Sequence, residues 1–91
     1  MYPIKADPEK LRGFAGDLKK FNETILQTID KLNRETNRLG NSWRDQEFEK
    51  FRSNFIPTVQ ALKEFTGESE KLIPKLRKHA DSIEEYQKKN I

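Results

Sequence analysis

The sequence predicts an all-α protein built as a hairpin of two long antiparallel helices. Apolar residues recur every seven positions on both sides of the midpoint, which is the spacing of a narrow stripe along a helix. Between the two periodic arms lie Gly40, Asn41 and Ser42, residue types that are common at helix ends. Because residues 40–42 leave room only for a short turn, the two helices must be antiparallel neighbours.

The composition favours a slender helical structure that associates with another chain. The 91 residues suffice for one small domain. Hydrophobic residues make up 33% and charged residues 36% of the chain, against roughly 45–50% and about 25% in globular domains. Such a chain is either disordered or helical with one apolar stripe per helix, and the regular spacing favours the helical structure. A stripe this narrow is hard to bury within one hairpin, so we expect oligomerisation.

Charge and residue usage exclude several classes of function. The net charge of +3 comes from 18 basic and 15 acidic residues without a basic tail, which argues against a nucleic-acid partner. The lack of cysteine excludes disulfides, thiolate metal sites and cysteine nucleophiles. No apolar run approaches the ~18 residues of a membrane span, and the polar N-terminus is no secretory signal peptide. We therefore expect a protein made in the cytoplasm that, if secreted, leaves without a cleaved signal peptide.

The first arm is predicted to be one helix over residues 8–39, after a flexible arm at residues 1–6. Asp7 can accept hydrogen bonds from the first amides, Pro8 suits the first helical position, and Glu9 favours the positive helix end. The stripe contains Leu11, Leu18, Ile25, Leu32 and Leu39, with Phe14 and Phe21 in the second seam position and Ala15 and Ile29 widening one side. This pattern is that of an amphipathic helix.

The turn is predicted at residues 40–42, with Trp43 as its anchor. Gly40 suits a left-handed conformation just past the first helix. Ser42 or Asn41 can cap the second helix, and Ser42 with Asp45 resembles a capping box.

The second arm is predicted to be a single helix over residues 43–89, kinked near Pro57 and Pro74. Its two seven-residue series are Phe48, Phe55, Leu62, Ser69, Leu76 and Ile83, and Phe51, Thr58, Phe65, Leu72, His79 and Tyr86. Each proline removes one backbone hydrogen bond and costs about 3 kcal/mol in a helix interior. Because the phase is preserved through both prolines, kinks are favoured over breaks. The alternative is a break near Thr66–Ser69, which would leave a separate C-terminal helix.

No residue pattern points to catalysis, a metal or a cofactor. An enzyme needs convergent polar groups in a concave pocket, which a two-helix hairpin does not offer. His79 is the single histidine and occupies a seam position, where a partly buried helix residue is the simpler interpretation. Adjacent carboxylates such as Glu84 and Glu85 belong to a solvated helix surface. The sequence therefore predicts a protein that is not an enzyme.

The phenylalanines are the strongest sign of a partner. All six, Phe14, Phe21, Phe48, Phe51, Phe55 and Phe65, lie on seam positions. One facing helix covers only part of such a ring, whereas a second hairpin would complete a four-helix bundle. The alternative is a marginal monomer. The predicted core of the hairpin or dimer is Leu11, Phe14, Leu18, Phe21, Ile25, Leu32, Phe48, Phe55, Leu62, Phe65, Leu72 and Leu76.

The residues around the turn resemble a known family. The chain is similar to the WxG family of small helical hairpins linked to type VII (ESX) secretion, the early-secreted-antigen-like proteins. In that family a leucine stands four residues before the tryptophan of a mid-chain Trp-x-Gly turn and an aromatic eight after it, as Leu39 and Phe51 do around Trp43. The run from Trp43 to Phe51 and on to Phe55, Asp7-Pro8-Glu9 and Ala80-Asp81-Ser82 also look like homodimeric members from Firmicutes.

Two departures from the family pattern bear on the turn and on export. Asp45 replaces the motif glycine, so this position cannot rely on a positive φ, and we expect Asp45 in the first helical turn. Many members end with a secretion signal of Tyr, three residues, then an acidic residue. Here Asn90 stands four residues after Tyr86, where the acidic residue would be. The secretion signal of this chain is therefore degenerate, carried by a partner, or absent. Packing explains Tyr86 equally well.

The resemblance implies a non-enzymatic secreted effector or secretion adaptor that acts through protein–protein contacts. Its expected partners are a second copy or another WxG-like hairpin, and a secretion ATPase to which Trp43 would be presented. The alternative is a general helical-hairpin interaction or chaperone protein with no secretion role. A nucleic-acid-binding protein is the weakest class, since it would require steep salt-dependent binding.

Overall fold

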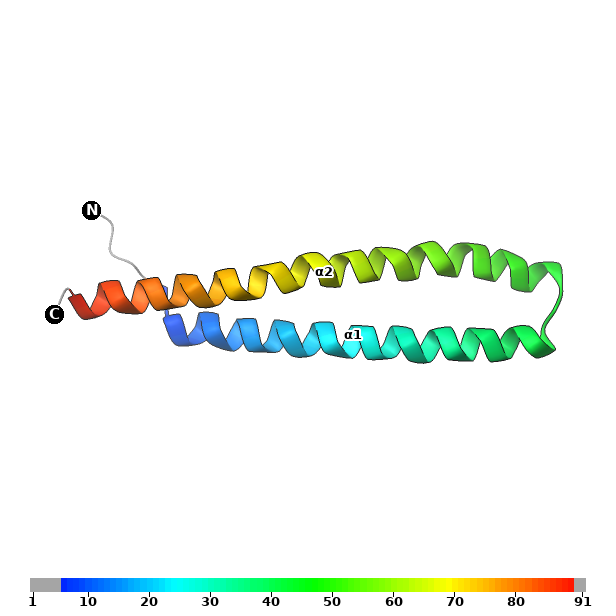
Figure 1. The fold of residues 1–91 in the computed structure, drawn as a ribbon, viewed down its shortest axis with the longest axis horizontal. Coiled ribbons are helices and arrows are strands. Elements are labelled where there is room, and N and C mark those ends of the chain that lie inside the picture. Colours follow the sequence, from blue (N-terminus) through cyan, green and yellow to red (C-terminus); the bar gives the residue numbers. More distant parts are fainter. Residues whose placement is uncertain (1–5, 90–91) are drawn as a thin grey trace.

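The computed structural model describes residues 6–89, which form two long helices joined by a short turn (Figure 1). Helix α1 spans Pro8–Ser42 and helix α2 spans Gln46–Lys89. They lie antiparallel in a molecule of 69 × 20 × 15 Å. The predicted all-α hairpin is confirmed. The expected arm at residues 1–6 falls largely outside the described residues, apart from Ala6, which precedes α1.

Helix α1 begins where the sequence predicts and ends later. Asp7 precedes it, and the Oδ1 atom of Asp7 accepts a hydrogen bond of 2.9 Å from the Glu9 amide. The expected end at Leu39 is wrong, because α1 continues to Ser42. Gly40 is helical, and no described residue has a positive φ, so the left-handed closure predicted at Gly40 does not occur. The Trp43 amide instead donates to the Leu39 carbonyl at 2.8 Å and closes the helix.

The connection lies at residues 43–45 rather than 40–42, and α2 begins at Gln46 rather than Trp43. The cap of α2 is Asp45, not Ser42 or Asn41. Its Oδ1 atom accepts hydrogen bonds from the amides of Glu47 at 3.0 Å and Phe48 at 3.1 Å. Asp45 therefore precedes the first turn of α2 instead of lying in it. Ser42 is not available as a cap, because it belongs to α1 and its hydroxyl donates to Leu39.

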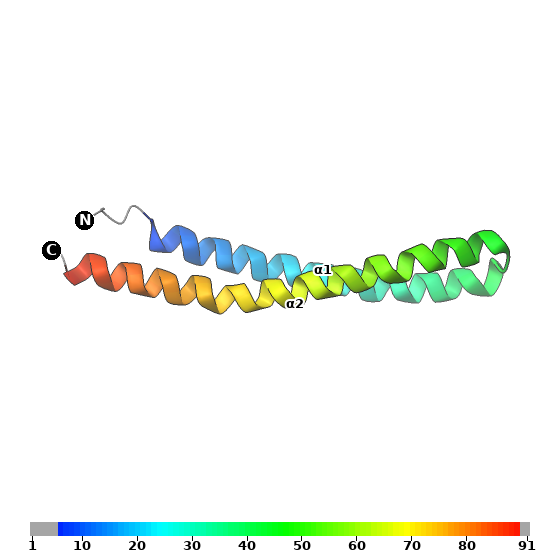
Figure 2. The ribbon, with the colours of Figure 1, turned by 90° about the horizontal axis from the view of Figure 1, so that it is seen from above.

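Helix α2 is continuous through Pro57, Gly67 and Pro74, so the alternative of a break near Thr66–Ser69 is wrong. Figures 1 and 2 show one gently curved helix that crosses α1 near the middle of the molecule. Local kinks at the two prolines stay a prediction. With 44 residues against 35 in α1, α2 extends beyond α1 at the open end.

The seam between the two helices is built mainly from small and polar side chains. Asn22 is fully buried at its centre, and its Nδ2 group donates to the Ser69 hydroxyl at 3.0 Å and to a Glu70 carboxylate oxygen at 3.2 Å. The other buried residues are Ala15 and Ile29 in α1 and Phe48, Val59, Thr66, Ile73, Ala80 and Ile83 in α2. Apart from Phe48 next to the turn, no aromatic ring of the described residues is buried in this seam.

Most of the large side chains predicted for the core are not buried by the hairpin. Of that set only Phe48 is buried, while Leu11, Leu18, Ile25, Phe55 and Leu76 are half-buried. The remaining six, Phe14, Phe21, Leu32, Leu62, Phe65 and Leu72, are exposed. A single hairpin therefore does not bury these six residues, and their place in the core of a dimer stays a prediction.

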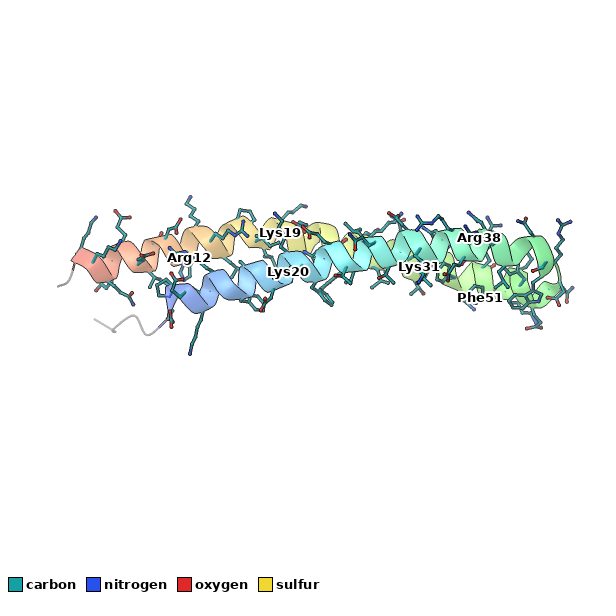
Figure 3. The ribbon with its side chains drawn as sticks, turned by 90° about the horizontal axis from the view of Figure 1, so that it is seen from below. Arg12, Lys19, Lys20, Lys31, Arg38 and Phe51 are labelled. Atoms are coloured by element: carbon teal, nitrogen blue, oxygen red, sulfur yellow. The ribbon has the colours of Figure 1, made fainter. Side chains whose placement is uncertain are left out.

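The open end of the hairpin is joined by ion pairs of Arg12 (Figure 3). This guanidinium lies 2.6 Å from Asp81 and 2.5 Å from Glu84 on α2, and 2.7 Å from Glu9 on its own helix. The hydrogen bonds that Arg12 donates to the carboxylates of Asp81 and Glu84 raise the pKa of Arg12. Hydrogen bonding and charge attraction from Arg12 lower the pKa of Glu84. The cluster connects the start of α1 to the last turns of α2.

Candidate interaction site

Four aromatic rings gather at the turn. The Trp43 ring meets Phe48 edge-on, with centroids 5.3 Å apart, and lies 6.3 Å from Phe51. Phe51 in turn stacks on Phe55 at 5.4 Å (Figure 3 labels Phe51 at this end). Aromatic pairs at such separations stabilise by roughly 0.5–1.5 kcal/mol beyond burial. Half-buried Trp43 thus anchors the turn to the first turns of α2.

Gly40 allows the turn to close on Phe48. A Cβ atom at Gly40 would lie 3.0 Å from Cζ of Phe48 and 3.1 Å from Cε2. The Phe48 ring is 7% exposed and is also held by Trp43, so it has little freedom to move. The glycine is needed here for close approach of the ring, and its negative φ is that of an ordinary helix.

The motif residues divide into two groups by exposure. Trp43 and Phe48 face inward and fix the turn, whereas Leu39 is 42% and Phe51 is 41% exposed. Asp45 is exposed and acts through its capping hydrogen bonds. Leu39 and Phe51 therefore offer apolar surface at the tip of the molecule.

A larger apolar surface runs along the hairpin toward the open end. We call the six exposed residues Phe14, Phe21, Leu32, Leu62, Phe65 and Leu72 the apolar face. They line two grooves between the helices. Phe14, Phe65 and Leu72 line the first, of about 590 Å³, together with Leu18, Leu76 and His79. Phe21, Leu32 and Leu62 line the second, with Ile25. The apolar face is thus shared by α1 and α2.

Part of the hairpin seam was missed at the sequence level, although Ala15 and Ile29 were assigned to the stripe of the first arm. The missed residues of α2 form a third seven-residue series, Val59, Thr66, Ile73 and Ala80, and the missed residue of α1 is Asn22. The spacing of this series was present in the sequence. Its small and polar members hid it, because large apolar residues occupy the two neighbouring series.

The candidate export residues lie at the open end. Tyr86 is half-buried in the last turns of α2, and Asn90 is outside the described residues. Two acid-to-base pairs lie nearby, with Lys88 3.5 Å from Glu84 and Lys89 3.5 Å from Glu85. The role of Tyr86 in export stays a prediction.

Within residues 6–89 no three His, Cys, Asp or Glu side chains are grouped in a way that could hold a metal ion. Over the same residues no helix is long and apolar enough to cross a membrane.

A family model described as proteins of 100 residues with WXG matches residues 3–88. The match covers both helices and the turn. The chain belongs to the WXG100 family. Trp43 is the tryptophan of the motif, and Asp45 stands in place of its glycine. The structure shows how the turn closes without that glycine, because Asp45 has no positive φ and caps α2 through its side chain.

Solved structures of a secreted protein, EsxB of Bacillus anthracis, have the same fold as this WXG100 chain. The selenomethionine-labelled protein is 29% identical, with a TM-score of 0.76 over 96% of this chain and 99% of EsxB. A proline-to-alanine mutant of EsxB gives a TM-score of 0.79 at 29% identity, over 93% of this chain and 96% of that one. An uncharacterized protein of Clostridium acetobutylicum is 27% identical over 93% of this chain and 88% of its own length.

Proposed function

We propose that this WXG100 protein is a non-enzymatic type VII secretion substrate or adaptor that acts as a dimer. Family membership and the likeness to a secreted protein support the link to secretion. The observation that carries the mode of action is the apolar face, where three phenylalanines and three leucines lie exposed outside the hairpin seam. A surface of this kind indicates a protein–protein contact.

A second copy of the chain is the occupant we propose for the apolar face. A flank of the molecule measures 69 × 20 Å, more than the roughly 800 Å² per partner of a standard interface. Fully burying a phenylalanine or leucine stabilises by roughly 1.5–3 kcal/mol, and each copy offers six such side chains that are 39–57% exposed. Two hairpins paired on this face form the predicted four-helix bundle, an assembly consistent with the WXG100 family.

The proposed recognition element for the secretion ATPase is the tip of the hairpin. Leu39 and Phe51 are exposed there, beside the turn that Trp43 fixes. Leu39 and Phe51 do not line either groove of the apolar face, so a dimer that covers the two grooves can leave them available for a second contact.

Fractionation of the producing cells tests the secretion role. We expect the intact chain in the culture medium of wild-type cells and its retention in the cytoplasm when the secretion ATPase gene is deleted. An intact mass equal to that of the cytoplasmic protein is expected if export removes no leader. Medium levels independent of the ATPase would favour the alternative, a general interaction or chaperone hairpin.

Substitution of the motif tryptophan tests the tip. Trp43→Ala is expected to reduce export and melting temperature while leaving helix content nearly unchanged, because the ring contacts lie at the turn only. Leu39→Ser removes exposed apolar surface at the tip but leaves all four rings of the turn in place, so it separates recognition from the ring contacts of the turn. Unaltered export and melting temperature in Trp43→Ala would remove Trp43 from the proposal.

A further inference from the structure

A buried carboxamide joins the two helices near the middle of the hairpin. Asn22 of α1 is fully buried, and its Nδ2 group donates to the Ser69 hydroxyl and to a Glu70 carboxylate oxygen on α2. Because a carboxylate can only accept, the amide has to turn its Nδ2 group toward Glu70. The orientation of the Asn22 side chain is therefore fixed by its partners on the other helix.

This carboxamide is held in the seam at a cost. The Oδ1 atom of Asn22 is buried as well, and no donor among residues 6–89 reaches it. A buried oxygen without a donor lowers stability, whereas an apolar side chain at the same place would not. A single asparagine in an apolar helix seam is known to specify register and oligomeric state at the expense of stability. Stability alone therefore does not explain why Asn22 is polar.

The acceptors for Asn22 are lost when α2 moves by one seven-residue period. A shift in either direction puts a leucine and a cation in the places of Ser69 and Glu70. The two replacing pairs are Leu62 with Lys63 and Leu76 with Arg77. Neither pair can accept a hydrogen bond from the Nδ2 group, because leucine is apolar and the two cations only donate. Asn22 thus distinguishes the observed register from its nearest alternatives.

The rest of the seam makes no such distinction. Around Asn22 the buried series of α1 carries Ala15 and Ile29, and α2 buries Val59 and Ile73. Apolar stripes of this kind pack against each other in more than one register, and the turn sets the register only within one chain. Helices of two copies could therefore also pair through these stripes. In such a pairing at another register, Asn22 would be buried without its acceptors, which is unfavourable.

We propose that Asn22 selects the pairing of the helices, so that the seam of α1 admits α2 only opposite Ser69 and Glu70. The apolar face is then left as the single surface through which two copies associate. This inference rests on the proposed dimer and adds the residue that keeps other assemblies from forming. An apolar residue in place of Asn22 should leave the helices at least as stable but permit assemblies other than the dimer.

Sedimentation velocity of the full chain and of Asn22→Val tests the proposal. Valine and asparagine have similar helix propensities. The natural chain is expected to sediment as one species, and Asn22→Val is expected to form an additional species heavier than a dimer. Asn54→Val is the matched control, because Asn54 is exposed on α2 and the same substitution there should leave one species. A single species of natural mass in Asn22→Val, or a heavier species in the control as well, would overturn the proposal.

Melting temperatures at one protein concentration test whether Asn22 depends on its acceptor. Ser69→Ala is expected to lower the melting temperature of the natural chain, because it leaves the buried amide with one acceptor fewer. The same substitution in Asn22→Val should have little effect. Equal falls in the two backgrounds would overturn the role of Asn22. A natural chain that sediments as a monomer would instead contradict the proposed dimer, and the melting temperatures would still decide whether Asn22 and Ser69 act together.

Discussion

The ring of Phe48 lies against the backbone of Gly40, so closely that a Cβ atom on the glycine would stand 3.0 Å from Cζ of the ring. This contact joins the last turn of α1 to the first turn of α2. It explains why a glycine, which weakens a helix by roughly 1 kcal/mol relative to alanine, is present near the end of α1.

Gly40→Ala is therefore expected to lower the free energy of unfolding by about 1–3 kcal/mol, because the new methyl group overpacks a confined ring. Gly67→Ala is the matched control, since Gly67 is also helical and nothing lies within 4 Å of its added Cβ. The control should stabilise by up to about 1 kcal/mol. Urea denaturation measures the free energy of unfolding of both variants. Equal stabilisation by Gly40→Ala and Gly67→Ala would show that the Phe48 contact does not constrain Gly40.

Asp45, which stands where the family motif has glycine, is predicted to stabilise the start of α2. Asp45→Ala is expected to cost about 0.5–2 kcal/mol, because the amides of Glu47 and Phe48 lose their acceptor. Asp45→Asn keeps an acceptor, and Asp45→Gly, which restores the family motif, should cost only a few tenths of a kcal/mol. Thermal melts at one protein concentration compare the three, and an Ala variant as stable as the natural chain would argue against the cap.

The Arg12 cluster predicts acid sensitivity of the open end. The folded-state pKa of Glu84 is lowered, so its ion pair stabilises the fold above the ordinary carboxylate value of 4.5 and is lost as the pH falls below that value. Hydrogen exchange across residues 77–89 should therefore accelerate below about pH 4.5, after correction for the intrinsic rate.

Arg12→Gln removes the cation and should raise exchange in the same segment at neutral pH. Lys50→Gln is its control, because Lys50 pairs with Glu47 on its own helix. Unchanged protection of residues 77–89 in Arg12→Gln would show that apolar packing at Ala80 and Ile83 holds the open end by itself.

The sequence predicted the helix pair and its polarity well, because a seven-residue period depends only on helix geometry. It misplaced the turn by three residues, since Gly40 suggested a helix end while its actual role is contact with Phe48, a residue of the other helix. The hairpin seam was missed for a related reason. Asn22 and Ser69 become buried because they meet across the two helices, where the Nδ2 group of Asn22 donates to the Ser69 hydroxyl.

The sequence pattern also did not predict which of the large side chains one hairpin leaves exposed. Periodicity assigns Phe14 and Phe65 to apolar seams, but it does not distinguish the seam inside one hairpin from a seam between two hairpins. The fold shows that both rings lie on the apolar face, 57% and 52% exposed. The proposed dimer follows from that placement.

The double variant Phe14→Ser/Phe65→Ser tests the apolar face at its first groove. It should weaken association at least 100-fold and leave helical circular dichroism largely intact, because neither ring is buried within one hairpin. Ile56→Ser is the matched control, since Ile56 is equally exposed at 53% but lies outside the grooves of the apolar face. Loss of association in the control as well would show that exposure alone, rather than this face, governs pairing.

The most direct test of the account is the mass of the natural chain in solution, measured by light scattering after gel filtration at pH 7.5. At micromolar concentration we predict twice the 10.8 kDa of a single chain. A mass near 10.8 kDa would contradict the claim that the apolar face pairs with a second copy.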